Sequence, residues 1–340
     1  MSQGRTIRVA EFPVRDVATV NALNELAQFQ FKYKDLDLLC HCNFRDEVRK
    51  NKKGKEQTCT RIETEPFLGN GKRNATKDSD AVSLTPGMCS SFAVWPPVRT
   101  PAQDLMAVCR NEALRPQFVF LGMNWSAQLS PAGHGDMNAR QYLEQLPRWS
   151  NWHGASIAPP DKKIGGKDNT RLVEAFGNGN PFRGGYMTDF VKGLVDSNAQ
   201  SVLRFLRKGA LSGCGENPFT IFLDILQKEL AALDKVFALS DVPKYLIVFG
   251  PAIYDGLQNL ACRIAGKSLD ELFPDRTVLR TGSFYAFPHG KTREQVIAGT
   301  RTLHFPDGEV RTIEEIEADF AQCACPQRQG RNSGTSDAKA

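Results

Sequence analysis

Residues 244–265 (KYLIVFGPAIYDGLQNLACRIA) decide the fold class of this chain. The apolar run from 244 to 249 is typical of a strand that is buried on both faces of a parallel sheet. Gly250 and Pro251 end this strand, and we expect a helix from there through Ala265, because proline suits the first turn of a helix. A buried strand that leads directly into a helix is the repeating unit of α/β folds.

The same alternation continues on both sides of this stretch. Residues 117–123 (QFVFLGM) and 278–284 (VLRTGSF) predict two further strands, and Thr292–Leu303 predicts a helix. Residues 217–233 predict the clearest helix, with Asn217 as its cap. Its apolar face would consist of Phe219, Phe222, Leu223, Leu226 and Leu230.

This order of elements predicts a three-layer α/β/α sandwich with a mostly parallel central sheet. Functional sites in such folds lie at the carboxyl ends of the strands. The loops that follow Met123, Phe249 and Phe284 are therefore expected to meet at one edge of the sheet.

The α/β domain is expected over residues 113–305, and residues 1–112 are expected to form an N-terminal extension or small subdomain. Within that extension, residues 16–29 predict a short amphipathic helix. Residues 45–55 hold six basic and two acidic side chains, which is typical of a solvated face and also suits nucleic-acid contact. Residues 69–81 have loop composition.

Beyond the α/β domain, residues 306–326 predict a C-terminal helical segment. Thr312 and Glu315 have the spacing of a capping box at its start. The tail from 327 to 340 is polar and rich in small residues, and is predicted to be disordered.

The composition sets limits on the class of protein. A charged fraction of 24% and a hydrophobic fraction of 41% over 340 residues argue against a disordered chain, a collagen or a coiled-coil rod. No run approaches the ~18 apolar residues of a membrane helix, and the first residues lack the apolar core of a signal peptide, so a cytoplasmic protein is expected. A net charge of +5 permits a nucleic-acid partner without requiring one.

The nine cysteines suggest reduced thiols or a metal site rather than a disulfide framework. Cys40, His41 and Cys42 together with Cys59 are a possible set of metal ligands. Scattered buried thiols are the favoured explanation of these residues. No metal or other cofactor is assigned from the sequence.

Four segments carry polar groups at or near predicted strand ends. They are residues 122–126 (GMNWS), 184–192 (GGYMTDFVK), 246–254 (LIVFGPAIY) and 283–291 (SFYAFPHGK). Taken in this order, the segments resemble the uracil-DNA glycosylase superfamily, and most closely its single-strand-selective branch with the motif G-M-N-P-G. The resemblance covers about residues 113–305.

The match departs from the family in three places. Trp125 is followed by serine where the family motif has Pro-Gly. Asp189 stands where several branches carry asparagine, and Pro288 precedes His289 where the family has the order H-P-S. These departures lie in the segments that would touch the base and the sugar.

The resemblance implies a cofactor-independent DNA glycosylase that flips a base out of the stack and cleaves its N-glycosidic bond. Asn124 would hold the attacking water, and His289 would stabilise charge on the departing base. The implied substrate-binding residues are Gly122, Met123, Trp125, Phe182, Thr188 and Asp189. The implied phosphate contacts, with duplex or single-stranded DNA as the partner, are Lys192, Gly250, Lys291 and Arg293.

Asp189 is the most informative departure, because a carboxylate only accepts hydrogen bonds, whereas uracil presents an N3–H donor and an O4 acceptor. A carboxylate favours a base with an exocyclic amine, as cytosine has. The sequence therefore suggests a modified cytosine, as found in some viral DNA. The resemblance, which extends to family members used in defence against phage, implies a possible antiviral role.

Simpler explanations exist for each of these residues: Asn124 as a turn asparagine, Asp189 as a helix cap or loop carboxylate, and His289 as a surface side chain. The alternative functions are an inactive nucleic-acid-binding module on the same fold and a nucleoside or nucleotide hydrolase.

Overall fold

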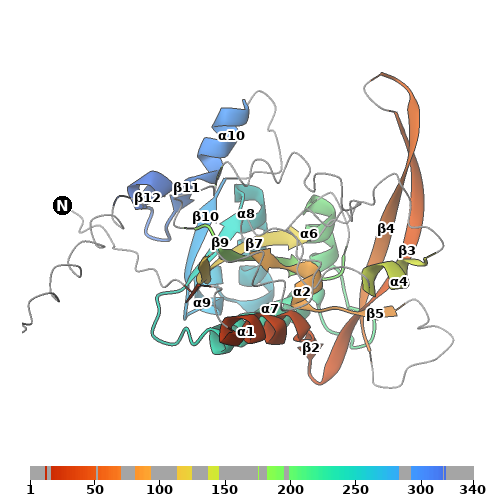
Figure 1. Ribbon diagram of the computed structural model, residues 1–340, viewed down its shortest axis with the longest axis horizontal. Helices are drawn as coiled ribbons and strands as arrows, with labels where there is room; N and C mark the ends of the chain where they lie inside the picture. Colours follow the sequence, from red (N-terminus) through yellow and green to blue (C-terminus); the bar gives the residue numbers. More distant parts are fainter. Residues whose placement is uncertain are drawn as a thin grey trace, which may run out of the picture.

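The computed structural model is an α/β protein with a mixed central sheet and a smaller antiparallel sheet (Figure 1). It describes residues 12–13, 17–50, 53–69, 81–92, 113–124, 137–144, 175, 182–194, 199–282, 292–316 and 318. Among these residues, no helix is both long enough and apolar enough to span a membrane.

The elements alternate along the chain as the sequence predicts for its second half. The described strands are β1 (Phe12–Pro13), β2 (Lys32–Tyr33), β3 (Leu36–Lys50), β4 (Glu56–Leu68), β5 (Ala81–Ser83), β6 (Ser91–Phe92), β7 (Ala113–Asn124), β8 (Gly185–Val191), β9 (Tyr245–Phe249), β10 (Thr277–Thr281), β11 (Thr302–His304) and β12 (Val310–Thr312). The described helices are α1 (Val17–Gln28), α2 (Pro86–Cys89), α4 (Ala139–Glu144), α6 (Ala199–Arg207), α7 (Pro218–Val236), α8 (Pro251–Leu260), α9 (Leu269–Leu272) and α10 (Arg293–Thr300). A π-helical turn, η1 (Ala261–Ala265), continues α8 to the predicted end of that helix.

Strands β10, β9, β7 and β8 lie side by side in that order and run parallel. Their ends at Thr281, Phe249, Asn124 and Val191 therefore meet at one edge of the sheet, which we call the carboxyl edge. The sequence predicted that the ends of the strands in 117–123, 244–249 and 278–284 meet. This is confirmed for the ends of β7, β9 and β10, of which the last is described up to Thr281.

Antiparallel strands widen this parallel core on both sides. β11 and β12 continue the sheet beyond β10, and β6 pairs with β8. β1 also pairs with the beginning of β7. The sheet thus takes strands from the predicted N-terminal extension, and it continues past residue 305.

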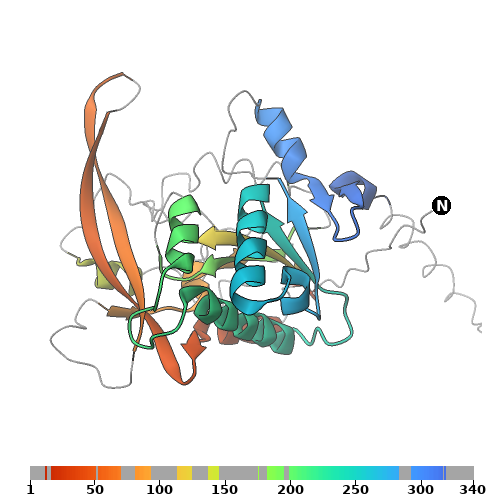
Figure 2. The same cartoon turned by 180° about the vertical axis from the view of Figure 1, so that it is seen from behind.

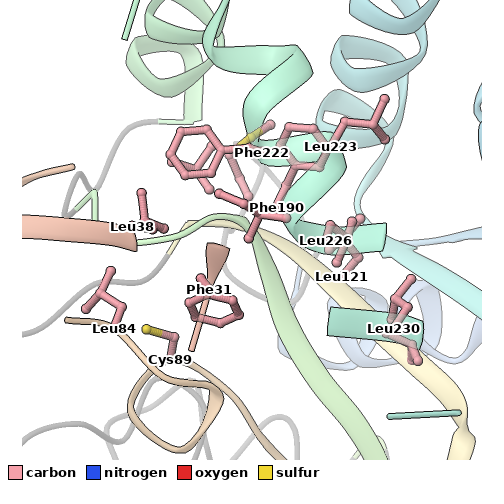
Figure 3. Packing of buried hydrophobic residues seen from close by; sticks show 14 of the residues in the cluster. Phe31, Leu38, Leu84, Cys89, Leu121, Phe190, Phe222, Leu223, Leu226 and Leu230 are labelled. Atoms are coloured by element: carbon pink, nitrogen blue, oxygen red, sulfur yellow. The ribbon is translucent and has the colours of Figure 1, made fainter. Parts of the chain in front are cut away.

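One face of the sheet is covered by α6, α7 and α8, which lie in front of the strands in Figure 2, and α1 packs against α7. Its core joins side chains of the N-terminal extension to those of the strands and α7, as Figure 3 shows for Phe31, Leu84, Leu121, Phe190 and Phe222. Described residues before 113, such as Phe31 and Leu84, are therefore packed into the same body as the α/β domain.

The opposite face carries a second apolar cluster. Its members come from alternate strand positions, from Ala175 and Phe182, and from the C-terminal segment, and they are Phe118, Phe120, Ala175, Phe182, Met187, Tyr245, Ile247, Phe249, Leu279, Leu303, Phe305, Ile313 and Ile316. Crossover connections between parallel strands are right-handed, so the direction in which a connection crosses the sheet decides which face it covers. The β7–β8 connection crosses in the opposite direction from the β8–β9 and β9–β10 connections, and the two sets therefore belong to opposite faces. A helical third layer on this second face stays a prediction, since most of residues 125–181 lie outside the described part of the chain.

Several predicted helix boundaries are confirmed. The Asn217 side chain accepts a hydrogen bond from the Phe219 N–H at 2.8 Å, and Pro218 occupies the first turn of α7. Thr312 and Glu315 form both hydrogen bonds of the predicted capping box. The predicted helix Thr292–Leu303 was too long, because α10 ends at Thr300 and the next residues form β11.

The smaller sheet is built around a long antiparallel hairpin of β3 and β4, which the sequence analysis did not predict. The pairing runs from Leu38 opposite Leu68 to Lys50 opposite Glu56. Both views show the hairpin projecting from the body (Figures 1 and 2).

Candidate functional site

The order of the parallel strands locates the candidate site. β7 comes first in the chain, β8 lies on one side of it and β9 on the other. Chain direction across the sheet therefore reverses between β7 and β9, and ligands of open α/β sheets bind in the crevice outside such a switch point. Asn124 ends β7 and Gly250 follows β9, so two residues predicted from the sequence flank this point.

A row of side-chain positions crosses the second face close to the carboxyl edge. Gly122 is the register partner of Asp189, and Phe249 is the register partner of Thr281. Because Leu121 pairs with Val248, Gly122 and Phe249 also lie side by side. In order across the sheet, the row therefore consists of the Thr281 hydroxyl, the Phe249 ring, Gly122 and the Asp189 carboxylate.

The row has the chemical groups of a site for a planar polar ring. Phe249 stacks on Phe120 with centroids 5.3 Å apart, which fixes the orientation of its ring. Gly122, which is buried, contributes no side chain between that ring and Asp189. Phe249 and Asp189 are both fully buried, so a ligand reaches them only when the carboxyl edge opens.

Asn124 is half-buried at the end of β7, two positions beyond Gly122. Its Nδ2 donates a hydrogen bond to the Leu194 carbonyl at 3.0 Å. Leu194 belongs to the turn that follows β8, so this bond ties the ends of two neighbouring parallel strands together. Met123 points to the helix-covered face, where it is buried in the main core.

On the helix-covered face, five buried polar residues form one network, which we call the Glu229 network. Its members are Ser90, Tyr186, Thr188, Lys192 and Glu229. One carboxylate oxygen of Glu229 accepts from the hydroxyls of Tyr186 at 2.7 Å and Thr188 at 2.9 Å, and Ser90 donates to the same oxygen at 3.1 Å. The other carboxylate oxygen pairs with the Lys192 ammonium at 2.7 Å, and Lys192 also contacts Thr188.

The network changes the acidity of its hydroxyl and thiol neighbours. Burial, reinforced by the Glu229 carboxylate, raises the pKa of Tyr186 well above its ordinary value. Burial also raises the pKa of the Cys89 thiol to about 12, although Lys192 opposes this shift. Both groups are therefore neutral at physiological pH.

These contacts correct two predicted roles. Lys192 was expected to contact phosphate, but its ammonium group is fully buried and paired with Glu229. Thr188 was expected to read the base together with Asp189, but successive strand residues point to opposite faces, and Thr188 bonds within the Glu229 network. Both residues contribute to the interior of the protein instead.

Phe182 and Gly250 also differ from their predicted roles. Phe182 is fully buried and packs edge-on against Phe118 at 4.7 Å between ring centroids, so it does not present a face to a base. The Gly250 N–H donates to the Thr281 carbonyl at 2.8 Å and is used within the sheet. Gly250 has a φ of 84°, a left-handed conformation that favours glycine at the entry to α8.

The remaining predicted site residues lie outside the described part of the chain. They are Trp125, His289 and Lys291; Arg293 begins α10, but its side chain is not described. The loop that contains His289 leaves the sheet after Gly282, whose N–H donates to the Gly299 carbonyl at the end of α10.

The hypothesis of a metal site is tested by the hairpin register. Cys42 lies opposite Thr64, whereas Cys59 lies opposite Glu47, five positions farther along the hairpin. That separation is about 16 Å, too far for ligands of one ion. His41 stacks on Phe67 on the face opposite the buried Cys40 and Cys42, and no metal-binding cluster occurs among the described residues.

A separate surface pocket of about 330 Å³ lies between β3, β5, α2 and α4. Arg140 and Glu144, the charged residues of its lining, pair with each other at 2.7 Å. The pocket offers no further ionisable side chain from its described lining, so we place the candidate site at the carboxyl edge.

Comparison with known proteins adds no relative: no family model, no curated protein and no solved structure matches this chain. The fold and the candidate site therefore define the class on their own. It is an α/β protein with a switch-point site between an asparagine strand end and a glycine turn.

Proposed function

We propose that the protein is a monofunctional DNA glycosylase of the uracil-DNA glycosylase type, which removes a modified base and leaves an abasic site. The observation that supports this most is the position of Asn124 and Gly250 on either side of the switch point. The two segments of the sequence that carry the resemblance on β7 and β9 thereby end at the place where such a fold binds its ligand.

The reaction needs a water held below the sugar and a pocket for the base. Water adds to the anomeric carbon, the N-glycosidic bond breaks, and its electron pair leaves with the base. The hydrogen bond from Asn124 Nδ2 to Leu194 fixes the amide, so that Oδ1 is the atom that orients the water. His289 remains the proposed donor to the departing base.

The row of Phe249, Gly122 and Asp189 is the proposed base site. The Phe249 ring offers a stacking face, and the glycine leaves room for the flipped base beside the carboxylate. Asp189 would accept a hydrogen bond from an exocyclic amine, which favours a modified cytosine over uracil. Because both side chains are buried, base entry requires a conformational change at the carboxyl edge.

The test is base release from oligonucleotides that contain cytosine, uracil, hydroxymethylcytosine or glucosylated hydroxymethylcytosine, followed by alkaline cleavage of abasic sites. We expect strand breaks with one modified cytosine. Asn124→Ala should slow release by about 100-fold, the usual effect of misplacing a reacting group, because the water loses the amide that positions it. Asn259→Ala, at an exposed position of α8, is the matched control and should leave the rate unchanged.

Each outcome bears on a different part of the proposal. Breaks on uracil alone would keep the enzyme class and overturn the role of Asp189, and Asp189→Asn would then not change the preference. DNA binding without breaks on any substrate would favour the inactive binding module. Turnover of free nucleosides without DNA binding would favour the nucleoside hydrolase.

A further inference from the structure

The hairpin of β3 and β4 extends well beyond the core of the protein. We call residues 43–63 the arm, and Cys42 and its partner Thr64, both buried, the arm root. In the described part of the chain, β5 pairs with β3 only at residues 39–41, and no strand pairs with the arm from outside. Eight register positions from Asn43 to Lys50 therefore extend about 26 Å beyond the arm root, with the half-buried Phe44 packing against the core near their start.

The end of the arm carries a concentrated positive charge. Residues 49–55 (RKNKKGK) hold five basic side chains and no acidic one. The whole chain has 43 Lys and Arg against 38 Asp and Glu, so without these five residues the charges would balance at 38 of each. Residues 49–55, which we call the arm tip, thus carry a positive charge equal to the net charge of the whole protein. Lys50, Lys53 and Lys55 are exposed there.

The arm is joined to the body at the carboxyl edge, next to Asn124. The Thr64 hydroxyl donates to the carbonyl of Gly193, and the neighbouring Leu194 carbonyl accepts from Asn124. Gly193 has a φ of 74°, and a Cβ at that position would lie 2.6 Å from Leu84 and 3.3 Å from Cys40. This close packing holds the arm root against the turn that also positions Asn124.

We propose that the arm binds the backbone of duplex DNA several base pairs away from the base that is being removed. This inference rests on the proposed function and adds to it a double-stranded substrate and a second DNA contact. A two-stranded β-ribbon has the width of the DNA major groove, and a row of lysines at its tip matches the phosphate charge. At 3.4 Å per base pair, a reach of about 26 Å corresponds to about eight base pairs from the site.

The experiment measures binding to an unmodified 30-base-pair duplex by fluorescence anisotropy between 50 and 200 mM KCl. The arm variant combines Lys50→Gln, Lys53→Gln and Lys55→Gln. The matched control combines Lys208→Gln, Lys235→Gln and Lys267→Gln, three exposed positions outside the hairpin that remove the same charge. Circular dichroism verifies that both variants are folded.

Each lost phosphate contact lowers the slope of log K against log salt by about 0.9. We expect the arm variant to lower that slope by up to about 2.7, so the loss of affinity from 50 to 200 mM KCl becomes about 40-fold smaller than in the wild type. The control should keep the wild-type slope. A 6-base-pair duplex, which is shorter than the reach of the arm, should show little difference between the proteins.

Equal slopes for the arm variant and the wild type would overturn the proposal, as would equal losses in the arm variant and the control. A wild-type protein that does not bind duplex DNA, or that binds anionic vesicles through the same lysines instead, would also overturn it. Base release from a short single-stranded oligonucleotide is measured in parallel. It tests the glycosylase activity separately, because such a substrate does not reach the arm tip.

Discussion

Removing the charge of Lys192 should strongly destabilise the protein, because its partner Glu229 is fully buried. In Lys192→Met the unbranched apolar side chain keeps most of the packing of the lysine stem, but it loses the contact of Nζ with the Phe31 ring, whose centroid lies 5.2 Å away. The Glu229 carboxylate then keeps only the hydroxyls of Tyr186, Thr188 and Ser90 as partners. A carboxylate without its counter-ion remains in a fully buried position.

The expected cost is about 3–5 kcal/mol, the usual penalty for removing one partner of a buried ion pair. Lys192→Met combined with Glu229→Gln removes both charges and keeps an acceptor oxygen for the three hydroxyls. We therefore expect the double variant to recover most of the loss. The two substitutions should be strongly coupled in a double-mutant cycle.

Urea unfolding followed by circular dichroism measures both quantities. With a slope of about 3 kcal/mol per molar urea, the midpoint of Lys192→Met should fall by about 1–1.7 M. The reasoning is refuted by a single-variant cost below about 1 kcal/mol, or by a double variant as unstable as the sum of the two single variants.

Two further predictions concern helix capping and pH. Asn217→Ala removes the cap of α7 and should lower the free energy of unfolding by about 1 kcal/mol, which Asn217→Gly should largely restore in the same urea assay. The pKa values of Cys89 and Tyr186 are raised in the folded state, so their contribution to stability is complete below the unfolded values near 9 and 10 and is lost as pH rises toward the folded values. The free energy of unfolding should therefore fall by about 1 kcal/mol from pH 9 to pH 10 through Cys89, and an unchanged pH dependence in Cys89→Ala would contradict this.

The sequence predicted the elements whose signals are local. The cap and apolar face of α7 follow from Asn217, Pro218 and the spacing of the leucines and phenylalanines, and all these residues are placed as expected. The buried strands β7 and β9 follow from continuous apolar runs. Local signals of this kind depend on backbone chemistry and periodicity, which a single sequence contains.

The long hairpin was missed because its outer half contains charged residues in place of an apolar face. The alternation of Leu36, Leu38, Cys40, Cys42 and Phe44 was a strand signal that could have identified its first half. The basic stretch that follows reads as a solvated loop, since nothing in the sequence states that it pairs with residues 56–68.

The Glu229 network was missed for a different reason. Glu229 lies on the apolar stripe of α7, three positions after Leu226, and a charge at such a position indicates a buried partner. The identity of that partner depends on which strand α7 covers, and that is a long-range property. The opposite orientations of Thr188 and Asp189, in contrast, followed from the period of a strand and could have been recognised in advance.

The arm root also makes the length of the arm independent of the rest of the molecule. Arm residues from Asn43 to Lys50 pair across the hairpin, and the fully buried core ends at Cys42 and Thr64, with only partial burial at Phe44. Deleting two residues from each strand would preserve the side on which every remaining side chain points, and would shorten the arm by about 6.6 Å, or about two base pairs. The reach of the protein along a polymer can thus change in steps during evolution, while the chemistry at the carboxyl edge stays constant.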